Sequence, residues 1–465
     1  MSQRNASEPD SNHCQQVISR RAFTPAAAAA LVLASRQGAR GAQLPPSDQL
    51  NIAGVGIGGM GQNYLKGCES QNIVALCDVD EVLAAPVFNR YPKAARYSDF
   101  RVMLEKEKTI DAVIIGTPDH AHAAVSMAAI AAGKAVYCAK PMTRTIFEAR
   151  TVARAAREHK VATQMSVQSC ASEGACATEE WVQSGIIGPV RAVHVWTDRP
   201  IWPQSLARPA EQEPVPAGLN WDLWLGPAPQ RPYHPIYHPF NFRGWVDFGT
   251  GALGDMACHS FHVIFRALKL GPPVGVNAST TFIREGVRAT RAYKSRRANF
   301  PETYPASSLV TWDFPARGDQ PPVSMHWYDG GIQPPRPAEL DIHTRMPEEG
   351  LYFVGDKGVL WSGFSGGPKL LADSLKRSFT PPEKTVPRTI GHYKEWIAAA
   401  KGGKPANCNF DFASLITETA LLGVIAQRTG RPLIWDSEAM RITNDQAADR
   451  LVRPQYREGW TLEKA

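Results

Sequence analysis

Short apolar runs alternate with helical segments over the first third of the chain. None is longer than six residues, and their mainly apolar character is typical of strands buried on both faces of a sheet. The runs lie at Asn51–Val55, Ile73–Cys77, Asp111–Ile115, Ala135–Cys138 and Val161–Met165. Strands that alternate with helices predict an α/β fold with a parallel, doubly wound sheet. Ligands of such sheets bind beyond the carboxyl ends of the strands.

The pattern changes near Ala192, where strand-like runs follow one another with few helices between them. These runs lie at Ala192–Thr197, Gly275–Ile283, Ser308–Phe314, Val323–Tyr328 and, as a hairpin, Leu351–Trp361. They predict a second, α+β domain with a large, open, mostly antiparallel sheet. Helices are expected near Ile390–Lys401 and Phe412–Arg428. We therefore predict domains at 48–170 and 171–387, followed by C-terminal helices and a tail at 388–465.

A glycine-rich turn follows the first apolar run. It reads Gly56-Ile57-Gly58-Gly59-Met60-Gly61 and fits G-x-G-x-x-G, although glycines at 54, 56 and 59 fit the same pattern in a second frame. In this motif the first glycine turns the chain, the second lets backbone approach a pyrophosphate, and the third brings the next helix close to the sheet. Because a strand precedes the turn and helical residues follow it, the sequence predicts a dinucleotide site here.

Asp78 ends the second apolar run, 22 residues after Gly56. A carboxylate at this place accepts hydrogen bonds from the adenosine ribose, and its charge repels a 2′-phosphate. We therefore expect NAD as the cofactor, with NADP disfavoured.

Further residues stand where later strands end, and we expect them to contact the cofactor. They are Thr117, Pro118, His120, Lys140 and Gln168. A charged Lys140 between a buried strand and a proline does not suit packing, so we expect it to serve the site.

An aromatic tract runs from Arg199 to Trp245. One interpretation is a long connection packed by its own aromatic side chains, which suits Trp221 and Trp224. The other is a wall of aromatic and guanidinium groups against a polyol or sugar ring. For that wall we expect the side chains Trp202, Tyr233 and Arg243.

Asp255, His259 and His262 share one face if a helix begins near Gly254. Their spacing could hold a divalent metal. However, an Asp-His-His metal site would not need the glycine-rich turn, and a metal would compete for the His259 lone pair. We expect no metal, and we expect His262 to bind substrate hydroxyls or to pack.

Composition excludes several classes of function. The chain has 465 residues, 43% hydrophobic and 20% charged, which is typical of an ordinary globular protein. The formal net charge of +7 is spread over scattered basic residues, so nucleic-acid binding is not supported. No apolar run approaches the ~20 residues of a membrane span. Eight scattered cysteines without C-x-x-C indicate reduced, packed thiols.

The first 42 residues have the order of a twin-arginine (Tat) export signal. Arg20-Arg21 precede an Ala/Leu/Val segment and a stretch of small residues. A disordered or amphipathic tail is the alternative. We expect the folded protein to be exported by the Tat machinery to the periplasm or another extracytoplasmic compartment.

Together these motifs resemble the Gfo/Idh/MocA oxidoreductases, which include glucose-fructose oxidoreductase and inositol dehydrogenases. The resemblance rests on the glycine-rich turn, Thr117-Pro118-Asp119-His120-x-His122, Lys140-Pro141 and Gly254-Asp255-x-x-x-His259. It is closest to the exported, Tat-signal-bearing branch. It implies an N-terminal Rossmann NAD-binding domain, a C-terminal open-faced sheet used for substrate binding and oligomerisation, and a dimer or tetramer.

The resemblance also assigns roles to residues. Lys140 matches the lysine of the family's Glu-Lys-Pro motif, and Asp255 and His259 match its Asp-x-x-x-His pair. These three are the expected catalytic residues, and His122 joins the expected cofactor contacts. Two departures stand out: Ala139 replaces the family glutamate, and His262 stands where relatives carry an acid.

Three functions remain open at the level of sequence. The first is an NAD-dependent dehydrogenase of a sugar, glycoside or cyclitol. The second is an NAD-dependent glycosidase or lyase that oxidises a ring hydroxyl transiently and eliminates the glycosidic group. The third is a non-catalytic sensor of NAD and sugar, which the missing glutamate favours and the presence of Lys140, Asp255 and His259 disfavours.

Overall fold

The computed structural model describes residues 49–285, 296–364 and 366–462. The expected Tat signal at 1–42 lies outside these residues.

Six parallel strands form the first sheet, in the order β3-β2-β1-β4-β5-β6. Their bounds are β1 Asn51–Val55, β2 Asn72–Cys77, β3 Ala95–Tyr97, β4 Ala112–Ile115, β5 Ala135–Cys138 and β6 Thr163–Met165. This is the strand order of a dinucleotide-binding domain, and it confirms the predicted parallel, doubly wound sheet. β3, a short edge strand, was not predicted.

Helices cover both faces of this sheet. Side chains such as Ile52 and Ile114 pack against α2, α3 and α11, whereas Ala53 and Val113 pack against α4, α5 and α6. Both faces of the central strands are therefore buried, which explains their mainly apolar runs. The helix bounds are α2 Gln62–Gly67, α3 Glu81–Arg90, α4 Phe100–Lys106, α5 His122–Ala131, α6 Ile146–His159 and α11 His392–Ala400.

Nine strands form the second sheet, in the order β15-β14-β13-β7-β12-β11-β8-β16-β17. All neighbouring pairs are antiparallel except β7 and β12, which confirms the predicted large, mostly antiparallel sheet. The strand bounds are β7 Val190–Trp196, β8 Gly275–Thr280, β11 Ser308–Phe314, β12 Val323–Tyr328, β13 Gly350–Gly355, β14 Gly358–Ser362, β15 Lys369–Leu370, β16 Leu433–Asp436 and β17 Arg441–Ile442.

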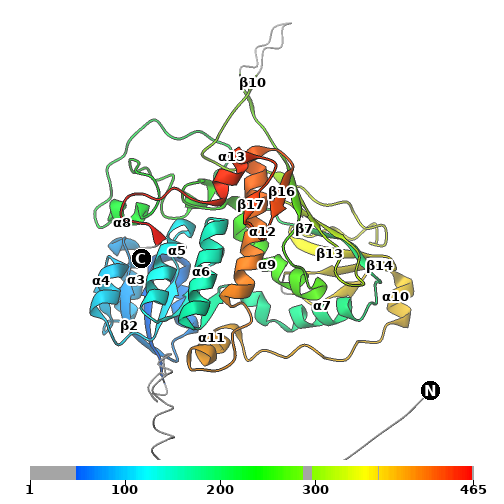
Figure 1. Ribbon diagram of the computed structural model, residues 1–465, viewed down its shortest axis with the longest axis horizontal. Helices are drawn as coiled ribbons and strands as arrows, with labels where there is room; N and C mark the ends of the chain where they lie inside the picture. Colours follow the sequence, from blue (N-terminus) through cyan, green and yellow to red (C-terminus); the bar gives the residue numbers. More distant parts are fainter. Residues whose placement is uncertain (1–48, 286–295, 365, 463–465) are drawn as a thin grey trace, which may run out of the picture. The chain divides into compact units, whose positions relative to one another are not determined.

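Helices α7 (Glu173–Gln183), α9 (Gly251–Leu268) and α12 (Phe410–Thr429) belong to the same core as this sheet. Phe261 of α9, for example, meets Trp312 and Trp327 edge-on at ring-centroid distances of 5.5 and 6.3 Å. α12 lies between α9 and α6 and so joins the cores of the two domains (Figure 1).

α12 also corrects the expectation of no membrane-length apolar run. Within the described residues it is the one helix long and apolar enough to cross a membrane, by length and composition. However, 78% of its apolar stretch is buried inside the protein, which is the environment of a core helix.

The aromatic tract crosses the first domain at the carboxyl ends of its strands. Gly218 O accepts from the Glu81 N–H, and Asn220 N–H donates to Val79 O. Within the tract, Trp221 and Trp224 stack at 4.6 Å, as the packing interpretation expected. The remaining elements are η1 Ile57–Gly61, η2 Asp119–Ala121, η3 Gln168–Ala171, α8 Trp221–Leu225, η4 Asn241–Gly244, β9 Arg284–Glu285, β10 Arg296–Arg297, α10 Asp373–Ser378, α13 Gln446–Asp449 and η5 Arg450–Val452.

The cysteines agree with the prediction of packed thiols. The seven that the structure describes are buried and free: Cys68, Cys77, Cys138, Cys170, Cys176, Cys258 and Cys408.

Candidate active site

A cavity of about 630 Å³ lies where the aromatic tract and α9 meet the carboxyl ends of β1, β2, β4 and β5. Residues of both domains line it. From the first domain come Gly56, Met60, Asp78, Thr117, Pro118, Lys140 and Gln168, and from the second come Trp202, Phe240, Arg243, Asp255 and His259. Most of the residues predicted for the site are therefore brought together.

The glycine-rich turn has the geometry of the frame at 56, 58 and 61. Gly56 adopts a left-handed φ of 73°, and a Cβ there would lie 2.5 Å from Thr117 N. A Cβ on Gly61 would lie 2.1 Å from Gly56 O, so this glycine permits close packing, as expected. A Cβ on Gly58, in contrast, would meet Leu83 Cγ at 2.6 Å, so this glycine makes room for α3.

Asp78 holds this turn in place. Its Oδ2 accepts from the N–H groups of Ile57 at 2.7 Å and Gly58 at 2.9 Å, and its Oδ1 accepts from Asp80 N–H at 3.0 Å. Burial raises the pKa of Asp78 and the three backbone donors oppose that rise. The carboxylate still lines the cavity, so it can serve the turn and a ligand together.

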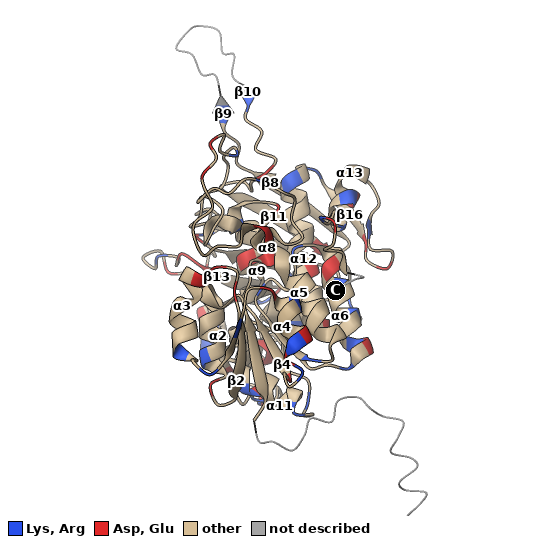
Figure 2. Cartoon of the chain, turned by 90° about the vertical axis from the view of Figure 1, so that its left-hand side faces the viewer, with Lys and Arg blue, Asp and Glu red and all other residues tan. Residues whose placement is uncertain are grey.

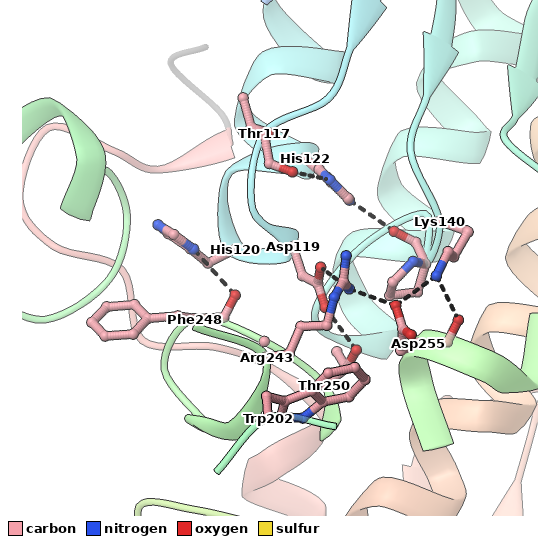
Figure 3. A network of polar contacts seen from close by, with 12 residues as sticks. Thr117, Asp119, His120, His122, Lys140, Trp202, Arg243, Phe248, Thr250 and Asp255 are labelled. Atoms are coloured by element: carbon pink, nitrogen blue, oxygen red, sulfur yellow. Dashed lines mark hydrogen bonds and ion pairs between the residues drawn. The ribbon is translucent and has the colours of Figure 1, made fainter. Parts of the chain in front are cut away.

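His120 and His122 do not reach the cavity, which corrects their predicted role as cofactor contacts. Each is 1% exposed, and each has both ring nitrogens against backbone carbonyls. His120 contacts Trp224 O at 2.9 Å. Figure 3 shows its contact with Phe248 O at 3.2 Å and those of His122 with Pro141 O and Thr117 O, each at 2.8 Å. Burial lowers the pKa of both rings, that of His120 to about 4. Through these contacts the two histidines stabilise the loops that carry Thr117 and Lys140.

Lys140 and Asp255 form the centre of a polar network (Figure 3). Lys140 follows β5, and its Nζ donates to Asp255 Oδ1 at 2.5 Å and to Asp255 O at 3.0 Å. Arg243 Nη1 lies 2.7 Å from Asp255 Oδ1 and 3.3 Å from Asp119 Oδ1. Thr250 Oγ1 donates to Asp119 Oδ2 at 2.7 Å. Two cations thus alternate with two carboxylates.

The network fixes the charge of Asp255. Burial opposes ionisation of this carboxyl, but Arg243 and Lys140 outweigh it and lower the pKa to about 2. Asp255 is therefore ionised at neutral pH.

His259 is the cavity group suited to accept a proton. It lies one helical turn after Asp255 on α9, and its ring makes no hydrogen bond to any described residue. Burial, followed by the positive charge of Lys140, lowers the pKa of His259 to about 3. The ring is therefore uncharged at neutral pH and keeps a free lone pair.

A second cavity, of about 430 Å³, continues from His259. It shares Gln168, Met256 and His259 with the first cavity. Its other lining residues are Ser169, Ser172, Glu349 and Phe364.

Two predicted substrate contacts lie outside both cavities. His262 is fully buried, and its Nε2 lies 2.9 Å from Ser169 Oγ because this part of the helix face is covered by η3. Tyr233 is 8% exposed and packs edge-on against Trp221 at 5.2 Å. The packing alternative therefore holds for both residues.

Trp202, a predicted substrate contact, and Gln168, a predicted cofactor contact, do lie at the cavity. Trp202 carries the Arg243 guanidinium over its ring at 5.8 Å. The Gln168 amide donates to the hydroxyls of Tyr137 and Tyr393, each at 3.3 Å, which fixes its orientation.

Sequence reasoning gave no role to several residues of the site. Asp119 belongs to the quoted motif and stands at a strand end, so the argument used for Lys140 would have found it. No such signal marks Thr250, His238 and Tyr64, because the segments that carry them reach the site only in the folded protein. His238 Nε2 lies 2.8 Å from Asp80 Oδ2, and Tyr64 OH lies 3.0 Å from Ser166 Oγ.

No group of three or more His, Cys, Asp or Glu side chains is placed to hold a metal ion within the described ranges. Asp255 and His262 face different surroundings, so the three-residue metal alternative lacks its geometry.

Two family models match the chain in the order of its domains. Residues 50–167 match the NAD-binding Rossmann fold of the Gfo/Idh/MocA oxidoreductase family, and residues 182–278 match that family's C-terminal α/β domain. Among curated relatives, inositol 2-dehydrogenase of Serratia proteamaculans is 29% identical over 150 residues, 31% of this chain and 44% of the relative. Levoglucosan dehydrogenase of Pseudarthrobacter phenanthrenivorans is 26% identical over 115 residues, 25% of this chain and 29% of the relative.

Solved structures share the two-domain fold over a longer stretch. WlbA dehydrogenase of Bordetella pertussis, solved with NADH and UDP-GlcNAcA, superimposes with a TM-score of 0.56 at 15% identity. That superposition covers 83% of this chain and 99% of WlbA. The alignments with the curated relatives named above cover less than half the length of each. The two matched segments and the shared fold support the Gfo/Idh/MocA oxidoreductase family for this chain.

Proposed function

We propose that this protein is an NAD-dependent oxidoreductase that transfers hydride between a secondary alcohol and nicotinamide. The observation that carries the proposal is one shared cavity: Lys140, Asp255 and His259 line it together with the glycine-rich turn and Asp78. The relatives' names support a sugar, glycoside or cyclitol as the substrate class.

The chain's residues fit a dinucleotide. Gly59 has open space beside its Cα, and Met60 beside it is 53% exposed, so the outer side of the turn is accessible. Gly56 to Gly61 and the start of α2 would hold the pyrophosphate, and Asp78 would accept from ribose hydroxyls. Bound NAD supplies the hydride acceptor for the substrate carbon.

The proton of the substrate hydroxyl is the part of the reaction that the protein handles. We assign His259 as the general base because its ring lines the cavity and its lone pair is free; its low pKa makes it a weak base at neutral pH. Lys140 Nζ, whose position is fixed by Asp255, is suited to donate a hydrogen bond to the substrate oxygen as charge develops there. Trp202 and Arg243 offer a flat aromatic and guanidinium wall for the ring.

A glycosidase reaction through transient oxidation is the second candidate. The specific observation is the second cavity at His259, which gives room for a substituent and places Glu349 on its wall. Burial raises the pKa of Glu349, with Arg199 opposing, so its carboxyl retains a proton at a higher pH than usual. Such a carboxyl could protonate a leaving glycosidic oxygen.

One experiment separates these functions. Purified protein is incubated with NAD and chromogenic glycosides, together with the free sugars and inositol, while NADH absorbance and released aglycone are followed. We expect net NADH, which marks a dehydrogenase. Aglycone without net NADH would mark the glycosidase cycle, and neither product would contradict both and favour a sensor.

Export and assembly are separate proposals. The twin-arginine segment supports export of the folded protein to the periplasm or another extracytoplasmic compartment. We also propose a homo-oligomer, a dimer or tetramer, which light scattering on the purified protein tests.

A further inference from the structure

Four arginines from separate segments line a third cavity, of about 280 Å³. They are Arg144 before α6, Arg428 in the last turn of α12, Arg450 directly after α13, and Arg453. None of the residues around this cavity lines the two cavities at His259. Figure 2 shows Lys and Arg positions gathered around α13.

Carboxylates do not balance these arginines. Asp247 is the one acidic side chain among the lining residues, and it is paired with Arg231, a further arginine that is 6% exposed. The side chains of Arg428 and Arg450 form no hydrogen bond or ion pair with any residue that the structure describes. Arg428, Arg450 and Arg453 are exposed, so water and salt screen part of their mutual repulsion, and an anion between them would reduce it further.

Arg144 adds an unpaired buried donor. Its Nη1 donates to Val246 O at 3.2 Å, but its Nε is buried without a partner. The nearby Glu148 attracts Arg144, yet the carboxylate oxygens of Glu148 already accept from Thr145 N–H and Tyr456 OH. Buried donors are nearly always paired in native proteins, so an unpaired one at a cavity wall indicates a missing acceptor.

The arginines also act on one common group. Tyr304 lines the cavity, and burial raises its pKa to about 12. Arg428 and Arg144 oppose that rise, whereas Asp119 and Asp247 add to it.

We propose that this cavity binds a small oxyanion, a phosphate- or carboxylate-bearing molecule, through Arg144, Arg428, Arg450 and Arg453. A guanidinium group offers two parallel N–H donors that match the oxygens of phosphate and carboxylate groups. The volume lies at the lower end of small-molecule sites, about 300 Å³, which suits a ligand smaller than a nucleotide. The site is separate from the proposed active site, and it does not depend on the reaction proposed there.

Calorimetric titration of the full chain with inorganic phosphate, and separately with citrate, tests the proposal. Sodium chloride keeps the ionic strength constant. We expect saturable binding of at least one of them with Kd below about 1 mM, and the stronger ligand identifies the phosphate or the carboxylate class. The double substitution Arg428→Gln and Arg450→Gln should weaken binding at least about tenfold. The proposal would be wrong if neither anion showed saturable binding, or if the double variant bound the anion as tightly as the parent protein.

A control and a second measurement exclude a purely structural role. Arg441→Gln removes a neighbouring arginine that pairs with Asp449 and does not line the cavity, so anion binding should persist.

Thermal melting is the second measurement. In chloride alone, the Arg428→Gln and Arg450→Gln double variant should melt at or above the parent protein, because the repulsion between the arginines is relieved. Phosphate or citrate should raise the Tm of the parent only. A double variant that melts lower in chloride would show that these arginines hold the fold together, and the proposal would be wrong.

Discussion

Lys140 Nζ and Asp255 Oδ1 lie 2.5 Å apart, and they connect the end of β5 to α9. One residue belongs to the domain with the glycine-rich turn and the other to the domain with the aromatic wall. The pair therefore joins the two domains at the cavity where His259 lies. Its side chains are 15% and 8% exposed, so water screens the interaction weakly.

The first prediction concerns the two groups assigned to the proton and the substrate oxygen. Lys140→Ala and His259→Ala should each reduce turnover by about 10²–10⁴, the range for loss of a general acid or base. NAD binding should persist, because the glycine-rich turn and Asp78 are untouched. Stopped-flow turnover and NAD titration check both expectations. Lys93→Ala, at an exposed position, is the matched control. Turnover retained in either active-site variant would remove that residue from the mechanism.

The second prediction concerns the charge of His259. Burial and then Lys140 lower its pKa to about 3, so the ring is neutral above that pH and becomes protonated only as the pH falls through it. An acid limb of kcat/KM between pH 5 and 7 should therefore not come from His259. Lys140→Met should raise the pKa of this ring, because a positive neighbour is lost. An NMR titration of His259 measures the shift, and an unchanged or lower pKa would contradict the electrostatic account.

The third prediction concerns Arg243, which contacts both Asp119 and Asp255. Arg243→Gln leaves these buried carboxylates with fewer positive partners and should destabilise the protein by about 3–5 kcal/mol. Asp119→Asn in the same chain should recover part of this loss, because one uncompensated charge is removed. Urea unfolding of the single and double variants gives the coupling free energy between Arg243 and Asp119. Additive losses would show that Arg243 and Asp119 do not act as a pair.

The sequence predicted the fold well where the pattern is local. The alternating strands and helices of the first domain and the two helices expected near Ile390–Lys401 and Phe412–Arg428 all appear in the structure. β3 was missed because its three residues form a partly exposed edge strand without an apolar run. Motif spacing likewise placed Gly56, Lys140, Asp255 and His259, since each stands at a strand end or on one helix.

The remaining site residues depend on packing between distant segments. Helical spacing put His262 on the same face as His259, but η3 covers that position and buries the ring. Tyr233 is aromatic like Trp202, yet one packs inside the tract and the other lines the cavity. Composition cannot separate these two outcomes, because they differ only in which neighbour each ring meets.

The fourth prediction concerns export. Replacing Arg20-Arg21 with Lys-Lys should retain the protein in the cytoplasm, because the Tat machinery reads the arginine pair. Cell fractionation with activity and antibody detection measures the distribution. Arg4→Lys, outside the pair, is the control and should leave export unchanged. Normal export of the Lys-Lys variant would reject the Tat proposal.

The fifth prediction is that NAD binds more tightly than NADP, because the Asp78 carboxylate repels a 2′-phosphate. Asp78→Ala should narrow the difference by ~1–3 kcal/mol, the scale of a lost charged hydrogen bond. It should also weaken NAD itself, since the N–H groups of Ile57 and Gly58 lose their acceptor.

Asp78→Asn separates these two effects. The amide oxygen still accepts from the turn while the charge is gone, so the preference should narrow with a smaller loss of NAD affinity. Burial raises the pKa of Asp78, so in the parent protein the preference for NAD should also weaken as the pH falls and the carboxyl takes up a proton. Calorimetric titration of both cofactors at pH 5 and at pH 7.5 measures each difference. Binding of NADP as tight as NAD at pH 7.5 would show that the charge of Asp78 does not select the cofactor.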